Sequence, residues 1–339
     1  MKILFALLFI TGILLSACGQ VKPTETQKVM EGTGMNAATE ETVSIAPLEP
    51  LTGKEALQGK KVIFIGNSFT YYGKCVLEKG QSVWGLENRV NDQGYFYQIC
   101  KANGVDVSVT NFTFGGHQLS DFYSGSCAAG RGHDGLNHLE YLNDRNYDYV
   151  VLQQGSGGKD VLDILEECKP LMRLFREGNP NTRFVFLVHH WAHIADHSYL
   201  VNVKTLEEAG FIVVDWGKLV ADVIDGTTAV PGATQTYDNS SFIISKSLED
   251  GFHENMLAGY ITAQMTFCAI TGESAVGQDY SFCGNPEVHK SFDFEVFKAK
   301  QYLFKTETNF IEIFDSESDM RGLQELMDKY LSEKAYRNY

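Results

Sequence analysis

The sequence has few charged residues, few prolines and a shortage of positive charge for its length. Only 21% of its 339 residues are charged and 7 are prolines, whereas 44% are apolar, which excludes a largely disordered acidic chain. Lysine and arginine number 28 against 43 aspartates and glutamates, so the formal net charge is −15. That balance is a poor basis for nucleic-acid binding, and we expect none. The sequence also lacks an internal repeat and any apolar run long enough to span a bilayer.

The one long apolar run stands at the N-terminus and is typical of a signal peptide. Ile3–Leu15 follows a single positive charge at Lys2 and is too short for a membrane-spanning helix. It ends in Leu15-Ser16-Ala17-Cys18, which resembles a bacterial lipobox. The resemblance implies a lipoprotein signal peptide over residues 1–17 and lipid on Cys18, which would hold the protein on the extracytoplasmic side of the cell envelope. The alternative is an ordinary signal peptide with an unrelated cysteine nearby.

Residues 18–56 predict a flexible tether. Threonine, glutamate and glycine alternate there with Pro23, Pro47 and Pro50, and no apolar period is present. Because the chain is acidic, lipid rather than charge would have to hold it at an anionic membrane surface.

From residue 57 to 285 the pattern predicts one α/β domain. Continuous apolar runs, typical of strands buried on both faces, occur at Lys61–Gly66, Val105–Phe112, Tyr147–Gln153, Arg183–Val188 and Phe211–Asp215. Helical patterns occur at Val90–Ala102, Asp160–Arg176, Tyr199–Ala209, Gly217–Ile224 and Asn255–Thr271. The alternation predicts a doubly wound, mostly parallel sheet flanked by helices, with ligands at the carboxyl ends of its strands.

Residues 286–339 predict a helical extension that packs on this domain. Asp293–Thr306 and Ser318–Ala335 are amphipathic, and we interpret both as packing elements rather than as parts of a site.

Three segments that follow predicted strands carry groups suited to acyl transfer. Ser68, directly after the first strand, can expose a hydroxyl nucleophile at the sheet edge, although Asn67 or Ser68 could equally cap a helix. Gly116 lets a backbone N–H point into a site, or it forms a tight turn. Gln153 and Gln154 offer amide donors, or cap their strand.

A fourth segment, Asp250-Gly251-Phe252-His253, carries a carboxylate and an imidazole three residues apart. Asp250 could accept the Nδ1 proton of His253 and leave Nε2 as a general base. The alternative is a turn aspartate beside a surface histidine.

Together, the four segments resemble the SGNH, or GDSL-type, serine hydrolases, over roughly residues 60–277. The resemblance implies a flavodoxin-like three-layer fold with Ser68 as nucleophile, His253 as base and Asp250 as the acid that orients it. It also implies an oxyanion hole formed by the N–H groups of Ser68 and Gly116, and neither cofactor nor metal.

The chain departs from the family pattern in two places. Asn67 replaces the usual aspartate, which we expect to matter little because that position shapes the turn. Gly157 stands about where the family has an asparagine. The first segment of this chain reads Gly66-Asn67-Ser68-Phe69-Thr70 and so resembles a branch of the superfamily that has glutamine in its third segment. The resemblance therefore assigns the amide donor to Gln153 or Gln154.

Several histidines lie outside this pattern. His189, His190, His193 and His197 could suggest a metal site, but consecutive histidines at a strand end would face opposite ways and no carboxylate or cysteine completes a ligand set. We instead expect His190 and Trp191 to line the substrate cleft. Phe69, Tyr71, Tyr72 and Trp191 could stack on a sugar, or pack in the core.

The resulting hypothesis is a lipid-anchored esterase that removes small acyl groups, such as acetyl, from carbohydrate; the carbohydrate is an analogy. The alternative is a non-catalytic surface lipoprotein that binds glycan or an envelope partner on a hydrolase scaffold.

The seven cysteines fit an extracytoplasmic location. With Cys18 lipidated, six remain: Cys75, Cys100, Cys127, Cys168, Cys268 and Cys283. Disulfides between Cys75 and Cys100 and between Cys268 and Cys283 are conceivable, and buried free thiols are the alternative.

Overall fold

The computed structural model describes residues 48, 51–73, 75–76, 89–90, 94–124, 139, 142, 144–155, 164–195, 204–243, 253–284 and 316–333. Its elements are η1 (Lys54–Ala56), β1 (Lys60–Gly66), α1 (Ser68–Tyr71), β2 (Arg89–Val90), α2 (Tyr95–Ala102), β3 (Val107–Thr113), α3 (Asp121–Ser124), β4 (Tyr149–Gln153), α4 (Ile164–Gly178), β5 (Arg183–Leu187), α5 (Trp191–Ala195), β6 (Ile212–Val214), α7 (Trp216–Ile224), α8 (Asn239–Phe242), α9 (Met256–Thr271), η4 (Ser281–Gly284) and α12 (Glu317–Glu333).

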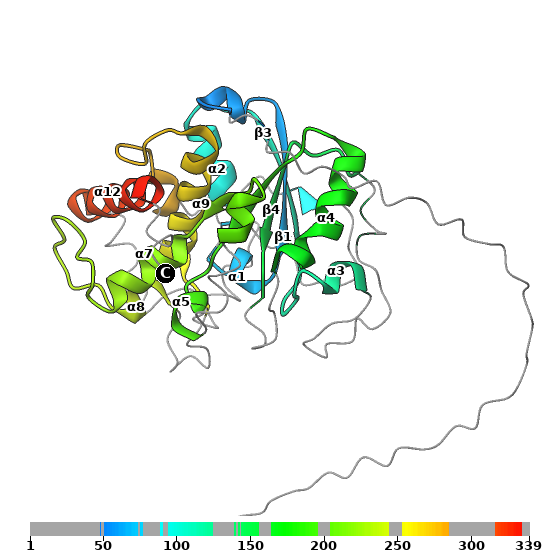
Figure 1. Cartoon of the computed structure of the whole chain (residues 1–339). Coiled ribbons are helices and arrows are strands. Elements are labelled where there is room, and N and C mark those ends of the chain that lie inside the picture. The colour runs from blue at the N-terminus through cyan, green and yellow to red at the C-terminus, as the bar shows by residue number, and fades with distance from the viewer. Residues whose placement is uncertain are drawn as a thin grey trace, which may run out of the picture. The chain divides into compact units, whose positions relative to one another are not determined.

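The strands form one sheet in the order β2-β3-β1-β4-β5-β6 (Figure 1). β3, β1, β4, β5 and β6 run parallel, and β2 alone pairs antiparallel, with β3. The predicted doubly wound, mostly parallel sheet is therefore confirmed. Since parallel strands all end at the same edge, Gly66, Thr113, Gln153 and Leu187 bring the segments that follow them close together.

Each face of the sheet is covered by its own layer of helices, as the continuous apolar strands require. Val62 and Phe64 of β1 point into a core shared with α2, α7, α9 and α12, whereas Ile63 and Ile65 point into a core shared with α3 and α4. Figure 1 shows these two layers on opposite sides of the strands.

Two expectations about these elements need correction. Arg89 and Val90 belong to the edge strand β2, so the helix predicted over Val90–Ala102 begins only at Tyr95.

None of the five described cysteines is joined to another by a disulfide, so the pairs Cys75–Cys100 and Cys268–Cys283 do not form. All five thiols are buried, and burial raises the pKa of Cys268 to about 12, which leaves this thiol protonated and unreactive at neutral pH.

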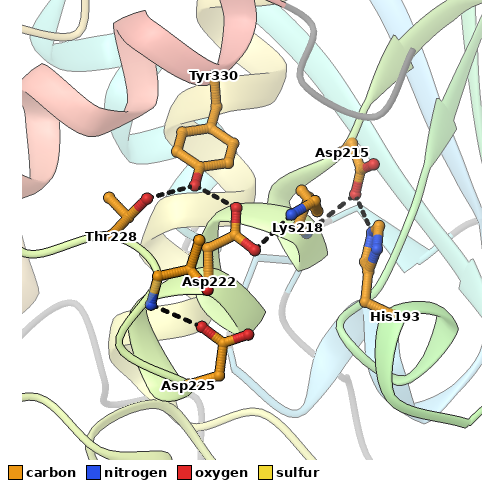
Figure 2. A network of polar contacts seen from close by, with 8 residues as sticks. His193, Asp215, Lys218, Asp222, Asp225, Thr228 and Tyr330 are labelled. Atoms are coloured by element: carbon orange, nitrogen blue, oxygen red, sulfur yellow. Dashed lines mark hydrogen bonds and ion pairs between the residues drawn. The ribbon is translucent and has the colours of Figure 1, made fainter. Parts of the chain in front are cut away.

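The C-terminal helix α12 is held by polar contacts as well as by its apolar face. The Tyr330 hydroxyl donates to the Asp222 carboxylate at 2.5 Å and lies 3.1 Å from the Thr228 hydroxyl (Figure 2). At the other end of α12, Asp319 accepts from the Thr234 N–H and from the Tyr237 hydroxyl, both at 3.0 Å. These buried bonds fix α12 against α7 and the chain that follows it.

No helix among the described residues is both long and apolar enough to cross a bilayer. Residues 1–18, with the predicted signal peptide and Cys18, lie outside the described residues, as do the helix predicted over Asp293–Thr306 and Cys127. The last residues of the predicted tether, which form η1, pack on the domain: the Gly53 N–H donates to the Thr271 carbonyl and Ala56 is fully buried.

Two glycines allow the start of α9 to contact the end of α1. A Cβ atom on Gly259 would overlap the carbonyl group of Gly73, and one on Gly73 would lie 2.7 Å from the backbone of Gly259. The two backbones therefore touch, and no side chain fits between them. Because His253 lies three residues before α9 and Ser68 opens α1, this contact brings the two predicted catalytic segments together.

We predict that Gly259→Ala destabilises the protein by about 2–3 kcal/mol or more, because the added methyl group has to push two backbones apart. Urea denaturation measures this change. The control is Gly277→Ala: no atom lies within 4 Å of the added Cβ, and only the left-handed φ of 82° opposes it. That strain amounts to about 1 kcal/mol. Equal stability changes in the two variants would contradict the prediction.

Candidate active site

Ser68 is the first residue of α1, two residues after the end of β1, and is the partly exposed residue in an otherwise buried segment. Its neighbours Gly66, Asn67, Phe69 and Thr70 are all buried. Asn67 caps α1 by accepting the Phe69 N–H at 3.1 Å. The capping interpretation thus applies to Asn67 and leaves the Ser68 hydroxyl available at the carboxyl edge of the sheet.

Gly116 lies in the loop after β3, where it is exposed and has a left-handed φ of 77°. The Phe114 N–H donates to the Gly66 carbonyl at 2.9 Å and so attaches this loop to the end of β1. In the part of the chain that the structure describes, neither the Gly116 N–H nor the Ser68 N–H has a hydrogen-bond partner. Both expected oxyanion donors are therefore open.

The two glutamines at the end of β4 have different surroundings. Both ends of the Gln154 amide are bonded: Oε1 accepts the N–H groups of Leu119 (2.8 Å) and Gly155 (3.0 Å), and Nε2 donates to Glu167 at 2.5 Å. Burial raises the pKa of Glu167, against the opposing hydrogen bond from Gln154. Gln154 thus links three segments, and one of the two N–H groups of its Nε2 is already bonded to Glu167.

Gln153 keeps one donor open. The Thr70 hydroxyl accepts the Asn67 N–H at 3.3 Å and donates to Gln153 Oε1 at 2.7 Å, which fixes the orientation of the amide. Gln153 Nε2 is fully buried and has no hydrogen-bond partner among the described residues. A buried donor of this kind is costly unless a ligand satisfies it, so Gln153 fits the predicted amide role better than Gln154.

His253 packs on the helix that Ser68 begins. Its ring stacks on Tyr72 with centroids 3.9 Å apart and lies 5.3 Å from the ring of Phe69. No hydrogen bond joins Ser68 to His253 in the structure; such bonds are often formed only once substrate is bound. Asp250 lies outside the described residues.

Phe69 carries a cluster of aromatic rings beneath this site. His189 stacks on Phe69 with centroids 4.5 Å apart and planes 3° from parallel, and His190 lies 5.8 Å from the same ring. The expectation that these two histidines face opposite ways is wrong, because β5 ends at Leu187 and its alternation stops there. Burial lowers the pKa of His189 well below its ordinary value, and the nearby His190 and His193 act in the same direction.

Of the two residues predicted to line the cleft, only Trp191 is partly exposed; His190 is buried against Phe69 and Trp216. Phe69 and Tyr71 are buried too, so for them core packing was the correct alternative.

Trp191 begins α5, which is held by a buried pair: His193 Nε2 lies 2.7 Å from Asp215 Oδ1 (Figure 2). The same oxygen accepts the Lys218 N–H at 3.0 Å and so caps α7.

The described residues contain no group of three or more histidine, cysteine, aspartate or glutamate side chains arranged to hold a metal ion. His197, the fourth histidine of the segment considered above, lies outside them.

No family model matches the chain, and no curated protein matches its sequence. Several solved structures are similar to it. The acetylxylan esterase Axe2 of Geobacillus stearothermophilus has 16% identity and a TM-score of 0.38, over 63% of this chain and 95% of its own. An α/β hydrolase, LAE5, from the metagenome of Lake Arreo has 19% identity and a TM-score of 0.40, over 64% and 96%.

A GDSL-like lipase from Parabacteroides merdae has 16% identity and a TM-score of 0.39, over 67% of this chain and 99% of its own. Similarity at this level does not determine a reaction, so the activity has to be argued from the side chains of this chain.

The buried, neutral His189 predicts a loss of stability in acid. Its folded-state pKa lies well below 6.5, so below about pH 6.5 the unfolded chain binds a proton there that the folded protein does not. Stability should therefore fall as the pH drops from 7.5 to 5. We expect His189→Phe, which preserves a ring on Phe69, to reduce this fall by up to about 1.4 kcal/mol per pH unit. Urea denaturation at both pH values tests this, and an unchanged pH dependence would contradict it.

Proposed function

We propose that the protein is a serine esterase of SGNH type, in which Ser68 attacks the carbonyl carbon of a carboxylic ester. The observation that carries the proposal is the end of β1: Ser68 is partly exposed between buried residues, and its own N–H and that of Gly116 are open. A nucleophile beside two open donors is what acyl transfer requires.

In the proposed reaction, His253 Nε2 takes the proton from the Ser68 hydroxyl as Oγ bonds to the carbonyl carbon. The N–H groups of Ser68 and Gly116, with Gln153 Nε2, stabilise the negative charge on the former carbonyl oxygen. His253 then gives its proton to the departing alcohol, which leaves an acyl group on Ser68. Water attacks this acyl group, again with His253 as base, and releases the carboxylic acid. Asp250 would orient the imidazole and stabilise its charged form.

The face of Tyr72 supports this role for His253. The Tyr72 ring lies parallel to the imidazole at 3.9 Å, and the face of an aromatic ring attracts a cation. An imidazolium formed during the reaction would thus be stabilised where it arises, while the neutral His189 below Phe69 would not repel it.

We further propose that the substrate carries small acyl groups, such as acetyl, on carbohydrate, and that the protein acts while attached to the cell envelope through lipid on Cys18. The partly exposed Trp191 at this edge of the sheet is a suitable stacking surface for a sugar ring. The anchor rests on the lipobox-like segment Leu15–Cys18.

Reaction with a fluorophosphonate probe tests the nucleophile. We expect folded wild-type protein to be modified at Ser68 and Ser68→Ala to remain unmodified, because the probe reacts with a serine hydroxyl activated by a neighbouring base. His253→Ala should lower the rate of labelling by a factor of about 10² or more. Labelling is located by mass spectrometry of the modified peptide.

The alternative, a non-catalytic lipoprotein that binds glycan or an envelope partner, predicts the opposite result. Folded wild-type protein that is not labelled and hydrolyses no acetylated polysaccharide or aryl ester would exclude the esterase. Binding of the intact polysaccharide by such a protein would then favour the alternative.

The choice between the two glutamines can be tested by changing each separately. Gln153→Met removes the open donor without adding charge, and we expect kcat to fall by about 10²–10³, the usual effect of losing one oxyanion donor. The matched control combines Gln154→Glu with Glu167→Gln, which exchanges the two groups of an existing hydrogen bond and should leave kcat within a few-fold of wild type. A large loss in the control together with an active Gln153→Met would reverse the assignment.

A further inference from the structure

Asn67 is a buried polar residue of the site that the proposed reaction does not use. Its side chain is 1% exposed, and both ends of its amide are bonded to backbone. Oδ1 accepts the Phe69 N–H at 3.1 Å, and Nδ2 donates to the carbonyl oxygen of His117 at 3.0 Å. One short side chain therefore connects the turn that holds Ser68 to the loop that holds Gly116.

The other contacts of the Gly116 loop act on either side of it. Phe114 is bonded to Gly66, the N–H of Gln118 donates to Asp121 at 2.7 Å, and the N–H of Leu119 donates to Gln154. Gly116 itself is exposed and has no side chain to hold it in place. Its distance from Ser68 is thus set by its neighbours, and the Asn67–His117 bond is a side-chain hydrogen bond that reaches directly from one segment to the other.

The chemistry of this contact requires an amide. An aspartate at position 67 could still accept the Phe69 N–H and cap α1, but it has no donor for the His117 carbonyl. Two oxygens with lone pairs would face each other at about 3 Å, which is repulsive and removes the bond that joins the two segments here. The asparagine at this position, where the resembled family usually has aspartate, thus makes a bond in this chain that an aspartate could not make.

We propose that Asn67 is a positioning residue that sets the spacing between the Ser68 and Gly116 N–H groups through its Nδ2 donor. Asn67 touches neither substrate nor reacting atoms and acts through the two backbones that it joins. This inference rests on the proposed esterase activity, because the spacing of these donors matters only when an oxyanion forms between them.

The test compares wild type, Asn67→Asp and the matched control Asn103→Asp with 4-nitrophenyl acetate as substrate. Asn103 donates from Nδ2 to the Ile99 carbonyl at 3.0 Å at the end of α2, so the control makes the same chemical change away from the site. We expect Asn67→Asp to lower kcat by about 10–100-fold with KM within threefold, and Asn103→Asp to leave kcat within twofold. The pH dependence of kcat should keep its shape, because the base is unchanged.

A second measurement separates positioning from a general loosening of the fold. An alkyl trifluoromethyl ketone adds to an active-site serine to give a tetrahedral oxyanion, so its affinity should fall in Asn67→Asp by the same factor as kcat/KM. Thermal unfolding of each variant shows how much fold stability changes independently of this factor.

Each outcome decides one question. Equal kcat and equal ketone affinity in wild type and Asn67→Asp would overturn the positioning role while leaving the esterase in place. A change confined to KM would overturn it as well. Wild-type protein that hydrolyses no ester and does not react with the ketone would overturn the proposed function, and this inference with it.

Discussion

The contact between Gly73 and Gly259 is the constraint on which the site depends. α1 is short and follows β1, whereas α9 begins almost two hundred residues later and is buried along nearly its whole length. An element buried on all sides can approach a neighbouring backbone only where neither carries a side chain. The two glycines provide that place, so the segment before α9 reaches α1. Ser68, which begins α1, and His253, which stacks on Tyr72 at the end of α1, thereby both lie at this helix although they are far apart in the sequence.

The carboxyl edge of the sheet is built largely from side-chain amides. Asn67, Gln153 and Gln154 are buried there, and each bonds to a segment distant in sequence. Such bonds in a water-excluded place are stronger than at the surface, and a missing partner is correspondingly costly. The structure satisfies nearly all of these groups. The donors that stay open are on Ser68, Gly116 and Gln153, in the segments that follow β1, β3 and β4 and that these amides connect. This arrangement is expected of a site that receives a negative charge only during reaction.

The sequence predicts the five parallel strands of the sheet well but misses the antiparallel edge strand β2. The five parallel strands and α9 follow from continuous apolar runs, and Gly272 ends α9 in the left-handed conformation that a helix C-terminus favours. β2 has only two residues, and because nothing in Arg89–Val90 separates a short edge strand from a helix start, tertiary pairing decides it. The choice between Gln153 and Gln154 depends on contacts with Thr70 and Glu167, which no local pattern encodes.

The aromatic cluster below the site follows from the same kind of long-range packing. The sequence pattern links Phe69, an apolar residue of the serine segment, to no histidine. In the structure, however, its ring contacts both His189 and His253. Burial keeps His189 neutral, so its ring adds no positive charge beside Phe69. Tyr72 meanwhile presents its face to the imidazole. Aromatic packing thus shapes the electrostatics of the proposed base: it places a neutral His189 on Phe69 and leaves the Tyr72 ring face, which favours an imidazolium, against His253.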